Sequence, residues 1–411
     1  MRILWFSVTP SLFNPRSNGH NGGGWIASLE QIIREESNVQ LGIAFHYNDE
    51  GGKHCNEGAT YYTIPTNTGH CIKKPFGNTK DEKEIVKHYL RIIEDFKPDI
   101  IHIFGSENDF GLICKHTDIP VVIHIQGCIP PYHNALFPVG LSKWDFIFKK
   151  GLSLSYRIIG LRSDRAFRKA AEREVKIIQS CKYFMGRTAW DKGLIELINP
   201  TATYFHCDEA LRDSFIGGTK RWEYKEDGKK SIISVISRPW YKGCDLILKT
   251  AALLKQFTDI EFEWKVYGIP DIKFYESVYG IKAQDVNVYP MGTANKDELV
   301  EALCSATCYV HPSYIDNSPN SICEAQILGV PVISTNVGGT SSIIDNGITG
   351  ILIPANAPYT AAHYIKEISN NGALAQELSR NAIEKATARH NPNSIKKRLL
   401  EIYKTIIMEQ K

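Results

Sequence analysis

The chain has 411 residues, of which 43% are hydrophobic and 23% are charged, and its formal net charge is +3. This composition is typical of a globular protein and excludes disordered and fibrous classes. The small net charge argues against a nucleic-acid partner, because such domains usually carry a large, clustered positive charge. At about 100–200 residues per domain, the length predicts two domains.

Ten cysteines are scattered along the chain, and none forms a C-x-x-C pair. We therefore expect reduced thiols in a cytoplasmic protein, without structural zinc. The apolar stretch 2–8 is short and soon meets Pro10, so it predicts a first core strand and not a signal peptide. No run approaches the ~18 apolar residues that a membrane-spanning helix needs.

Short apolar runs alternate with helical patterns through the first half of the chain. The predicted strands are 2–8, 40–46, 99–104, 120–125, 182–186 and 202–206. The predicted helices lie near 24–36, 82–97, 108–117, 164–180 and 188–198. The strand runs are continuously apolar, as in strands covered on both faces, and the alternation predicts a parallel sheet with crossover helices.

A second alternating series follows the polar segment 217–230, which we interpret as an interdomain linker. Its predicted strands are 231–237, 261–267, 286–289, 307–311, 331–335 and 350–353. Its predicted helices are 243–257, 296–304, 319–329, 339–345, 358–370, 373–389 and 393–409. The fold class is therefore α/β, with Rossmann-like domains at 1–216 and 231–390. The last helix, within 391–411, is expected to return to the first domain.

The most informative stretch, 309–339, holds a strand, a loop and the start of a helix. Ser318 is predicted to cap this helix, with Pro319 at its first position. The backbone N–H groups of Asn320 and Ser321 would then be free to bind an anion such as a diphosphate. For this start alone, an ordinary capped helix without a ligand is the favoured interpretation, and only the wider pattern changes that.

Two carboxylates flank that helix start. Glu324 lies about one turn inside the helix, where its carboxylate could accept two ribose hydroxyls. Asp316 stands eight residues earlier, in the loop, where it could meet the sugar end of the same ligand.

A second element, Ser237 to Gly243, ends the first strand of the second half and opens a helix. Its Arg238 and Lys242 would converge at the strand end and form an anion clamp. A solvated basic turn is the alternative interpretation.

Several glycines follow strands and are candidates for donor binding. Gly22 and Gly23 belong to a loop in which consecutive glycines would let a ligand approach the backbone closely. Gly268 and Gly292 each follow a strand in the second half, where they could shape a nucleobase pocket.

Together these motifs resemble the signature of the retaining GT-B glycosyltransferases of glycosyltransferase family 4. In that signature two acids stand eight positions apart, before a Gly-Val-Pro-Val-Ile strand and a Gly-Gly turn. Asp316, Glu324 and Gly338-Gly339 match it in this sequence, although the first acid is usually Glu. The resemblance implies a GT-B fold with two Rossmann-like domains facing a cleft.

The resemblance also implies residue roles. Arg238 and Lys242 would hold the donor diphosphate, and the loop with Gly22 and Gly23 would lie over it. The acceptor-side candidates are Gln126, His133 and Arg187. The family often has a His where this chain has Gln126, and Gln cannot act as a general base at neutral pH.

The segment 143–176 contains ten basic and four acidic residues interleaved with aromatic and aliphatic ones. Two interpretations stay open, a solvated helix face or peripheral contact with an anionic membrane surface. The second would place the protein at the inner face of the membrane.

The motifs and the resemblance together predict a nucleotide-sugar-dependent glycosyltransferase that acts on a saccharide or lipid-linked acceptor, and the resemblance implies retention at the anomeric carbon. The resemblance implies surface polysaccharide or glycolipid assembly, and a UDP-sugar is the working assumption for the donor. No cofactor beyond this co-substrate is expected. Because no Asp-x-Asp stands at a strand end, no metal is expected either. Two alternatives stay open, a nucleotide-sugar epimerase on the same scaffold and a non-catalytic nucleotide or sugar binder.

Overall fold

The computed structural model describes residues 1–13, 24–47, 51–56, 58–65, 82–144, 154–226, 228–237 and 240–410. The chain divides into two compact units. Unit 1 consists of Met1–Pro130, Arg168–Ala210 and His390–Lys411, and unit 2 consists of Pro131–Phe167 and Leu211–Arg389. Unlike the predicted ranges, neither unit is one continuous stretch.

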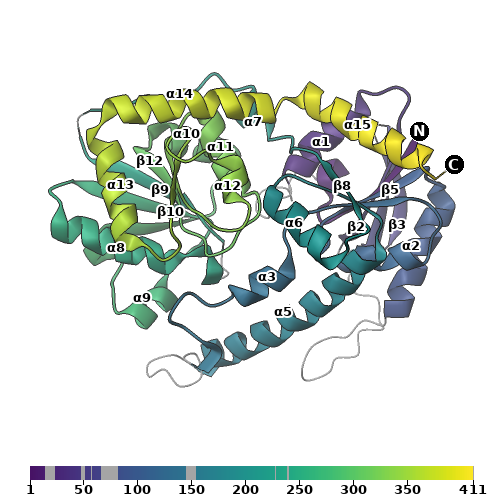
Figure 1. The fold of residues 1–411 in the computed structure, drawn as a ribbon, viewed down its shortest axis with the longest axis horizontal. Coiled ribbons are helices and arrows are strands. Elements are labelled where there is room, and N and C mark those ends of the chain that lie inside the picture. Colours follow the sequence, from purple (N-terminus) through teal and green to yellow (C-terminus); the bar gives the residue numbers. More distant parts are fainter. Residues whose placement is uncertain are drawn as a thin grey trace. The chain divides into compact units, whose positions relative to one another are not determined.

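Unit 1 is built on an eight-stranded sheet in the order β3-β4-β2-β1-β5-β6-β7-β8 (Figure 1). Every neighbouring pair is parallel except β3 and β4, which are antiparallel. Its strands are β1 (Arg2–Ser7), β2 (Gln40–Tyr47), β3 (Gly52–Asn56), β4 (Ala59–Pro65), β5 (Ile100–Phe104), β6 (Val121–His124), β7 (Tyr183–Gly186) and β8 (Thr203–His206). The sequence patterns did not predict β3 and β4.

Strand β1 shows why the strand runs are apolar throughout. Ile3 and Trp5 pack into the core on one face of the sheet. Leu4 and Phe6 pack into a second core on the other face. Because both faces are covered, successive residues of the strand are buried and no polar alternation appears in the sequence.

The helices of unit 1 follow its strands, as crossover connections require. They are η1 (Ser11–Phe13), α1 (Gly24–Arg34), α2 (Glu82–Phe96), η3 (Asp109–Lys115), α6 (Ala189–Ile198) and α15 (Pro392–Met408). The predicted helix at 108–117 is the 3-10 helix η3. Helices α3 (Ile129–Asn134) and α5 (Leu154–Ser180) run across the boundary between the two units.

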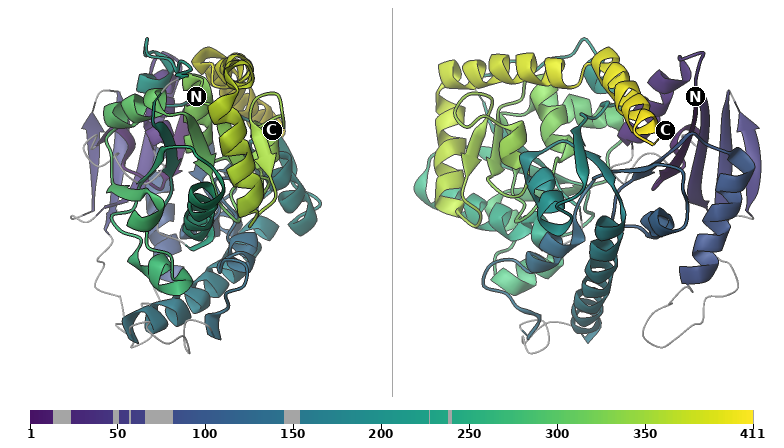
Figure 2. Two further views of the ribbon diagram at one scale, coloured as in Figure 1. Left: turned by 90° about the vertical axis from the view of Figure 1, so that its left-hand side faces the viewer. Right: turned by 45° about the vertical axis from the view of Figure 1, so that its right-hand side comes forward.

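The C-terminal helix α15 belongs to unit 1. Figure 2 shows it, in yellow, beside α1 in purple. Tyr403 is fully buried, and its hydroxyl lies 3.2 Å from Trp5 Nε1 and 2.6 Å from His102 Nδ1. Ile395, Leu399, Ile402 and Ile406 are also buried. Each buried aliphatic side chain contributes about 1.5–3 kcal/mol, which attaches the helix firmly to this unit.

Unit 2 is built on a six-stranded sheet in the order β11-β10-β9-β12-β13-β14, and all its pairs are parallel. The strands are β9 (Lys230–Val235), β10 (Phe262–Tyr267), β11 (Val288–Gly292), β12 (Cys308–His311), β13 (Val332–Thr335) and β14 (Ile351–Ile353). Counted along the chain this is the doubly wound order 3-2-1-4-5-6, which reverses direction between its first and fourth strands. The reversal lies between β9 and β12.

Helices cover both faces of this sheet and enclose one continuous core. In Figure 1, α8 and α13 lie on one side of the strands, and α10 and α11 lie on the other. The helices of unit 2 are α7 (Asp213–Ile216), η4 (Trp240–Lys242), α8 (Cys244–Phe257), α9 (Lys273–Tyr279), η5 (Gln284–Val286), α10 (Lys296–Ser305), α11 (Asn320–Leu328), α12 (Thr340–Ile343), α13 (Pro358–Asn370) and α14 (Gly372–Arg389).

The segment 131–167 groups with unit 2 although it lies in the first half of the chain. Its Phe137 ring stacks on the Trp240 ring with centroids 5.3 Å apart, and its Tyr132 ring lies 5.1 Å from the Tyr241 ring. These aromatic contacts explain why a continuous first domain at 1–216 is not observed.

Candidate donor site

Lys242 and Asp316 lie where the strand order of unit 2 reverses. Strands β9 and β12 are direct neighbours, and both end at the same edge of the sheet. The loop after β9 carries Lys242, and the loop after β12 carries Asp316. In doubly wound sheets this crevice, outside the carboxyl ends of the strands, is where ligands bind.

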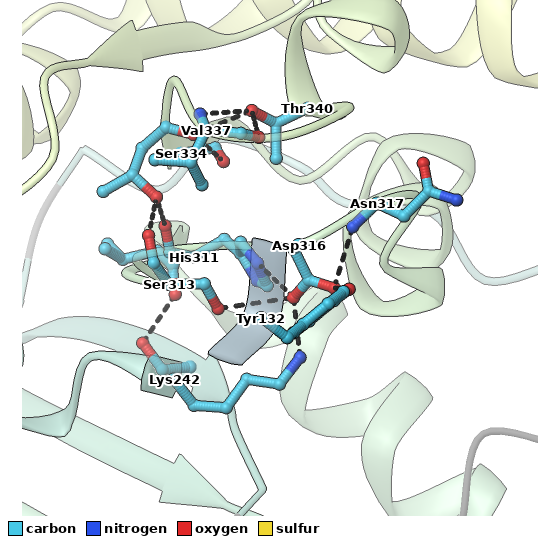
Figure 3. A network of polar contacts seen from close by, with 12 residues as sticks. Tyr132, Lys242, His311, Ser313, Asp316, Asn317, Ser334, Val337 and Thr340 are labelled. Atoms are coloured by element: carbon cyan, nitrogen blue, oxygen red, sulfur yellow. Dashed lines mark hydrogen bonds and ion pairs between the residues drawn. The ribbon is translucent and has the colours of Figure 1, made fainter. Parts of the chain in front are cut away.

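Lys242 and Asp316 form a mostly buried ion pair at this point (Figure 3). The Lys242 Nζ lies 2.7 Å from Asp316 Oδ2, and the side chains are 18% and 9% exposed. The same oxygen also contacts His311 Nε2 at 3.1 Å and Ser313 Oγ at 3.3 Å. The Asp316 carboxylate is therefore fixed from several sides and in turn orients the lysine.

The other carboxylate oxygen, Oδ1, has donors of its own. It accepts the backbone N–H of Asn317 at 3.2 Å and the Tyr132 hydroxyl at 3.4 Å. Sequence reasoning missed Tyr132, because it stands 184 residues before Asp316 and no local pattern links the two.

Two glycines, Gly243 and Gly338, let their own loops approach the loop after β12 closely. Gly243 has φ 76°, and a Cβ there would lie 1.9 Å from the Pro312 carbonyl oxygen. Gly338 has φ 53°, and a Cβ there would lie 1.8 Å from the Asp316 carbonyl oxygen. The following residue, Gly339, donates its N–H to that carbonyl at 2.9 Å. Only glycine fits such close approaches, so the predicted Gly-Gly turn holds the Asp316 loop in place.

The charges of this cluster follow from its contacts. Burial alone would raise the pKa of Asp316, but Lys242 and His311 more than offset it and hold that pKa far below its usual range. Burial lowers the pKa of His311, although Asp316 opposes the change. A neutral imidazole beside an ionised carboxylate must donate from Nε2, because a carboxylate only accepts. The cluster therefore carries one negative and one positive charge.

Helix α11 begins at Asn320, immediately after this loop. Its N-cap is Pro319, with extended backbone at φ −69° and ψ 120°, so the expected cap at Ser318 is wrong. Proline has no side-chain acceptor, and the first intrahelical bonds run from the Ile322 and Cys323 N–H groups to the Pro319 carbonyl. The half-buried Asn320 and Ser321 thus occupy the first turn, whose amides favour anions.

Glu324 lies one turn further into α11 and is 5% exposed. It does not stand alone, because the Arg212 guanidinium donates to its Oε1 from Nε at 3.0 Å and from Nη2 at 2.6 Å. Arg212 precedes α7 and was not singled out from the sequence. The separation of 112 residues hides this pair from any sequence pattern.

Gly268 and Gly292 stand at the carboxyl ends of β10 and β11, on the far side of β9 from Asp316. The Gly268 N–H donates to the Gly292 carbonyl at 2.7 Å. A Cβ at Gly268 would lie 2.2 Å from the Ile236 carbonyl oxygen. The two glycines and the loop with Lys242 therefore lie at the same end of the sheet, where its parallel strands finish.

Three predicted site residues lie outside the described residues. They are Gly22, Gly23 and Arg238. Their roles stay predictions.

The acceptor-side candidates fall in different places. His133 Nε2 lies 3.0 Å from Asp164 Oδ1 within unit 2. Arg187 is buried in unit 1, where it pairs with Glu209 and donates to the Ile125 carbonyl at 3.3 Å. Gln126 is half-buried two residues after β6.

Unit 1 also holds two acids that were not predicted as site residues. Glu107 follows β5 and accepts the Gly127 N–H at 2.7 Å, and Glu174 of α5 accepts the Ile129 N–H at 2.6 Å. Burial, reinforced by the Glu107 charge, raises the pKa of Glu174 to about 8. Both carboxyls thus anchor the loop after β6 that contains Gln126.

Among the described residues, no group of three or more His, Cys, Asp or Glu side chains is placed to hold a metal ion. In the same part of the chain, no helix combines the length and apolarity needed to cross a bilayer.

The second half of the chain is similar to known protein sequences. Residues 218–385 match the family described as Glycosyl transferases group 1. Over 145 residues the chain is 30% identical to a D-inositol 3-phosphate glycosyltransferase of Paenarthrobacter aurescens, covering 34% of this chain and 35% of that one. The chain spans less than half the length of the curated relatives that it matches.

Solved structures resemble the whole chain. A sucrose-phosphate synthase from Thermosynechococcus elongatus matches with a TM-score of 0.71 at 15% identity, covering 100% of both chains. The HepE protein of Anabaena, in complex with UDP-glucose, matches with a TM-score of 0.65 at 12% identity, covering 98% of this chain and 100% of that one. The fold of this protein is therefore GT-B, and its residues 218–385 match the family described as Glycosyl transferases group 1.

Proposed function

We propose that the protein transfers a sugar from a nucleotide-diphosphate donor, bound at the switch point of unit 2, to a saccharide or lipid-linked acceptor. The observation that carries the proposal is the Lys242–Asp316 pair, fixed next to the first turn of α11. An ammonium has three donors, and Asp316 takes one of those on Lys242, so the others can meet a diphosphate. A UDP-sugar is the donor we test first, since HepE was solved with UDP-glucose.

The proposed role of these residues is to stabilise the negative charge of the leaving diphosphate. As the glycosidic bond to the donor breaks, negative charge builds up on the departing diphosphate. The Lys242 ammonium and the amides at Asn320 and Ser321 are held ready to stabilise that charge, which is electrostatic preorganisation. Arg238 would add a second cation. We propose that no metal ion is needed for this step.

We propose retention at the anomeric carbon by front-face attack, in which the leaving phosphate accepts the proton of the acceptor hydroxyl. The five donors to Asp316 support a positioning role for this acid, with Lys242 as its main partner. An anomeric assay by NMR would show an axial product from an axial donor, and an inverted product would refute the mechanism.

We propose that the enzyme acts in the cytoplasm, at the membrane face, in surface polysaccharide or glycolipid assembly. The support is helix α5, where Arg162, Arg165, Lys169 and Lys176 are exposed and follow one another at intervals of three, four and seven residues, so they share one face. Such a stripe suits anionic headgroups. Sedimentation with phosphatidylglycerol vesicles, but not with phosphatidylcholine vesicles, is the expected result, and equal partition into both would exclude it.

The donor site is tested by calorimetric titration of UDP, GDP, ADP and CMP into wild type and Lys242→Met. The matched control is Lys249→Met, which breaks another mostly buried pair of unit 2, between Lys249 Nζ and Asp245 Oδ2 at 2.8 Å. Loss of one charged contact should weaken binding about 10- to 100-fold. We expect this loss for Lys242→Met and near wild-type binding for Lys249→Met.

Absence of binding to any of the four nucleotides would overturn the donor site. Equal weakening in both variants would show that Lys242 acts only through the stability of unit 2. Turnover of a nucleotide sugar to its epimer without an acceptor would favour the epimerase, and binding without any turnover would favour a non-catalytic binder.

A further inference from the structure

The Arg212–Glu324 contact is one-sided. Both guanidinium donors, Nε and Nη2, converge on the single oxygen Oε1, at 3.0 and 2.6 Å. A guanidinium more often meets a carboxylate with two parallel bonds, one to each oxygen. Here the second oxygen, Oε2, accepts no hydrogen bond from the described residues. The pair therefore uses only half of the carboxylate.

The unused half lies in a place where water has little access. The Glu324 side chain is 6% exposed, and Arg212 is 26% exposed. The Oε2 atom itself is not fully buried, so a ligand can reach it, and a carboxylate oxygen in such a place takes its donor from water or from a ligand. The Oε2 atom is thus an acceptor placed one turn inside α11, the helix that begins four residues after Asp316.

The guanidinium also favours the charged form of this acceptor. Burial raises the pKa of Glu324, and Arg212 opposes that rise. Tyr309 of β12 is the other titratable group that senses the Glu324 charge, and burial keeps its own pKa above the usual range, so it stays neutral. Without Arg212, the carboxyl would take up a proton at higher pH and lose acceptor strength.

We propose that Arg212 is a positioning residue for the donor nucleotide: it holds Glu324 through Oε1 so that Oε2 is presented to the ribose hydroxyls. This inference rests on the proposed function and adds to it a residue outside the sequence signature. Arg212 does not touch the reacting atoms, and its effect reaches the nucleotide only through Glu324.

The test compares binding of UDP, GDP and ADP with binding of their 2′,3′-dideoxy forms to wild type, Arg212→Met and Arg212→Lys. For the wild type, loss of both hydroxyls should weaken binding about 10- to 100-fold. In Arg212→Met the normal nucleotide should weaken by a similar factor while the dideoxy form changes little, so the ribose preference disappears. Arg212→Lys, which keeps the charge, should restore part of that preference.

A pH series adds a readout that a purely structural role would not change. Binding of the normal nucleotide should fall as pH decreases through the Glu324 pKa, and this fall should occur at higher pH in Arg212→Met than in wild type. Should Arg212→Met not fold, the same shift, smaller in size, is expected for Arg212→Lys.

The outcomes separate this inference from the proposal beneath it. No nucleotide binding by wild type would overturn the donor site itself, and the inference with it. Wild-type binding with equal losses for normal and dideoxy nucleotides in Arg212→Met would leave the donor site standing and overturn the role of Arg212. Affinity equal to or tighter than wild type would also overturn it, because Arg212 would then compete with the ligand.

Discussion

Replacing Asp316 with asparagine keeps the side-chain shape and removes the charge that Lys242 depends on. The two side chains are 9% and 18% exposed, and their charged atoms lie 2.7 Å apart. Removing one partner of a buried pair costs about 3–5 kcal/mol, because the other charge stays behind without compensation. Since some solvent reaches Lys242, we expect Asp316→Asn to lose about 3 kcal/mol of the free energy of unfolding of unit 2. Lys242→Met should lose about 1–2 kcal/mol, because the carboxylate keeps its other donors.

Hydrogen exchange of peptides from 308–325 measures this loss locally, without assuming that both units unfold together. The double variant should lose about 2 kcal/mol less than the sum of the single variants, which is the coupling expected of a direct pair. Because the folded pKa of Asp316 is depressed, its contribution is present above the unfolded value of about 3.9 and disappears as pH falls toward the folded value. Additive losses, or an Asp316→Asn protein as stable as wild type, would refute this reasoning.

Three further predictions concern other parts of the molecule. Gly338→Ala should displace the Asp316 loop and weaken nucleotide binding about tenfold or more, since its Cβ would overlap the Asp316 carbonyl oxygen; calorimetry checks this, and unchanged affinity would contradict it. Glu174 has its pKa raised to about 8 by burial and by Glu107, so unit 1 should lose stability as pH rises toward that value, by up to ~1.4 kcal/mol per pH unit. Glu174→Gln should flatten the dependence in hydrogen exchange of the β5 and β6 peptides, and an unchanged slope would exclude the assignment. Tyr403→Phe should destabilise unit 1 by about 1–3 kcal/mol because two buried partners lose their hydroxyl contact, whereas equal exchange protection in α15 would argue against it.

Much of the fold follows from apolar patterning. The ends of all six strands of unit 2 lie within three residues of their predicted positions, because each strand is a short apolar run between polar turns. Strand β3 gives the opposite case. Its residues, Gly52–Asn56, are all exposed and largely polar, and they form a strand only because β4 offers a free edge to pair with. Such a strand depends on tertiary pairing and leaves no hydrophobic signal.

The site shows the same division between local and distant information. The spacing from Asp316 to Glu324 and the Gly-Gly turn are local patterns, and the structure brings Asp316, Lys242 and Gly338 together at one sheet edge. Tyr132 and Arg212 were missed because their partners lie 184 and 112 residues away.

The start of α11 also differs from its prediction. Ser318 has the side chain of a preferred cap, yet Pro319 takes the cap position, because its own backbone is extended and the first helical residue is Asn320. The helix therefore begins one residue later than cap preference suggests, which is a common uncertainty at helix ends.

The most direct test of the account is a crystal structure of the protein with the nucleoside diphosphate that binds best in calorimetry. We expect the diphosphate against Lys242 Nζ and the first-turn amides of α11, and the ribose hydroxyls against Glu324 Oε2 with Arg212 still on Oε1. A nucleotide bound in unit 1, or bound in unit 2 away from Lys242 and Glu324, would contradict the central claim.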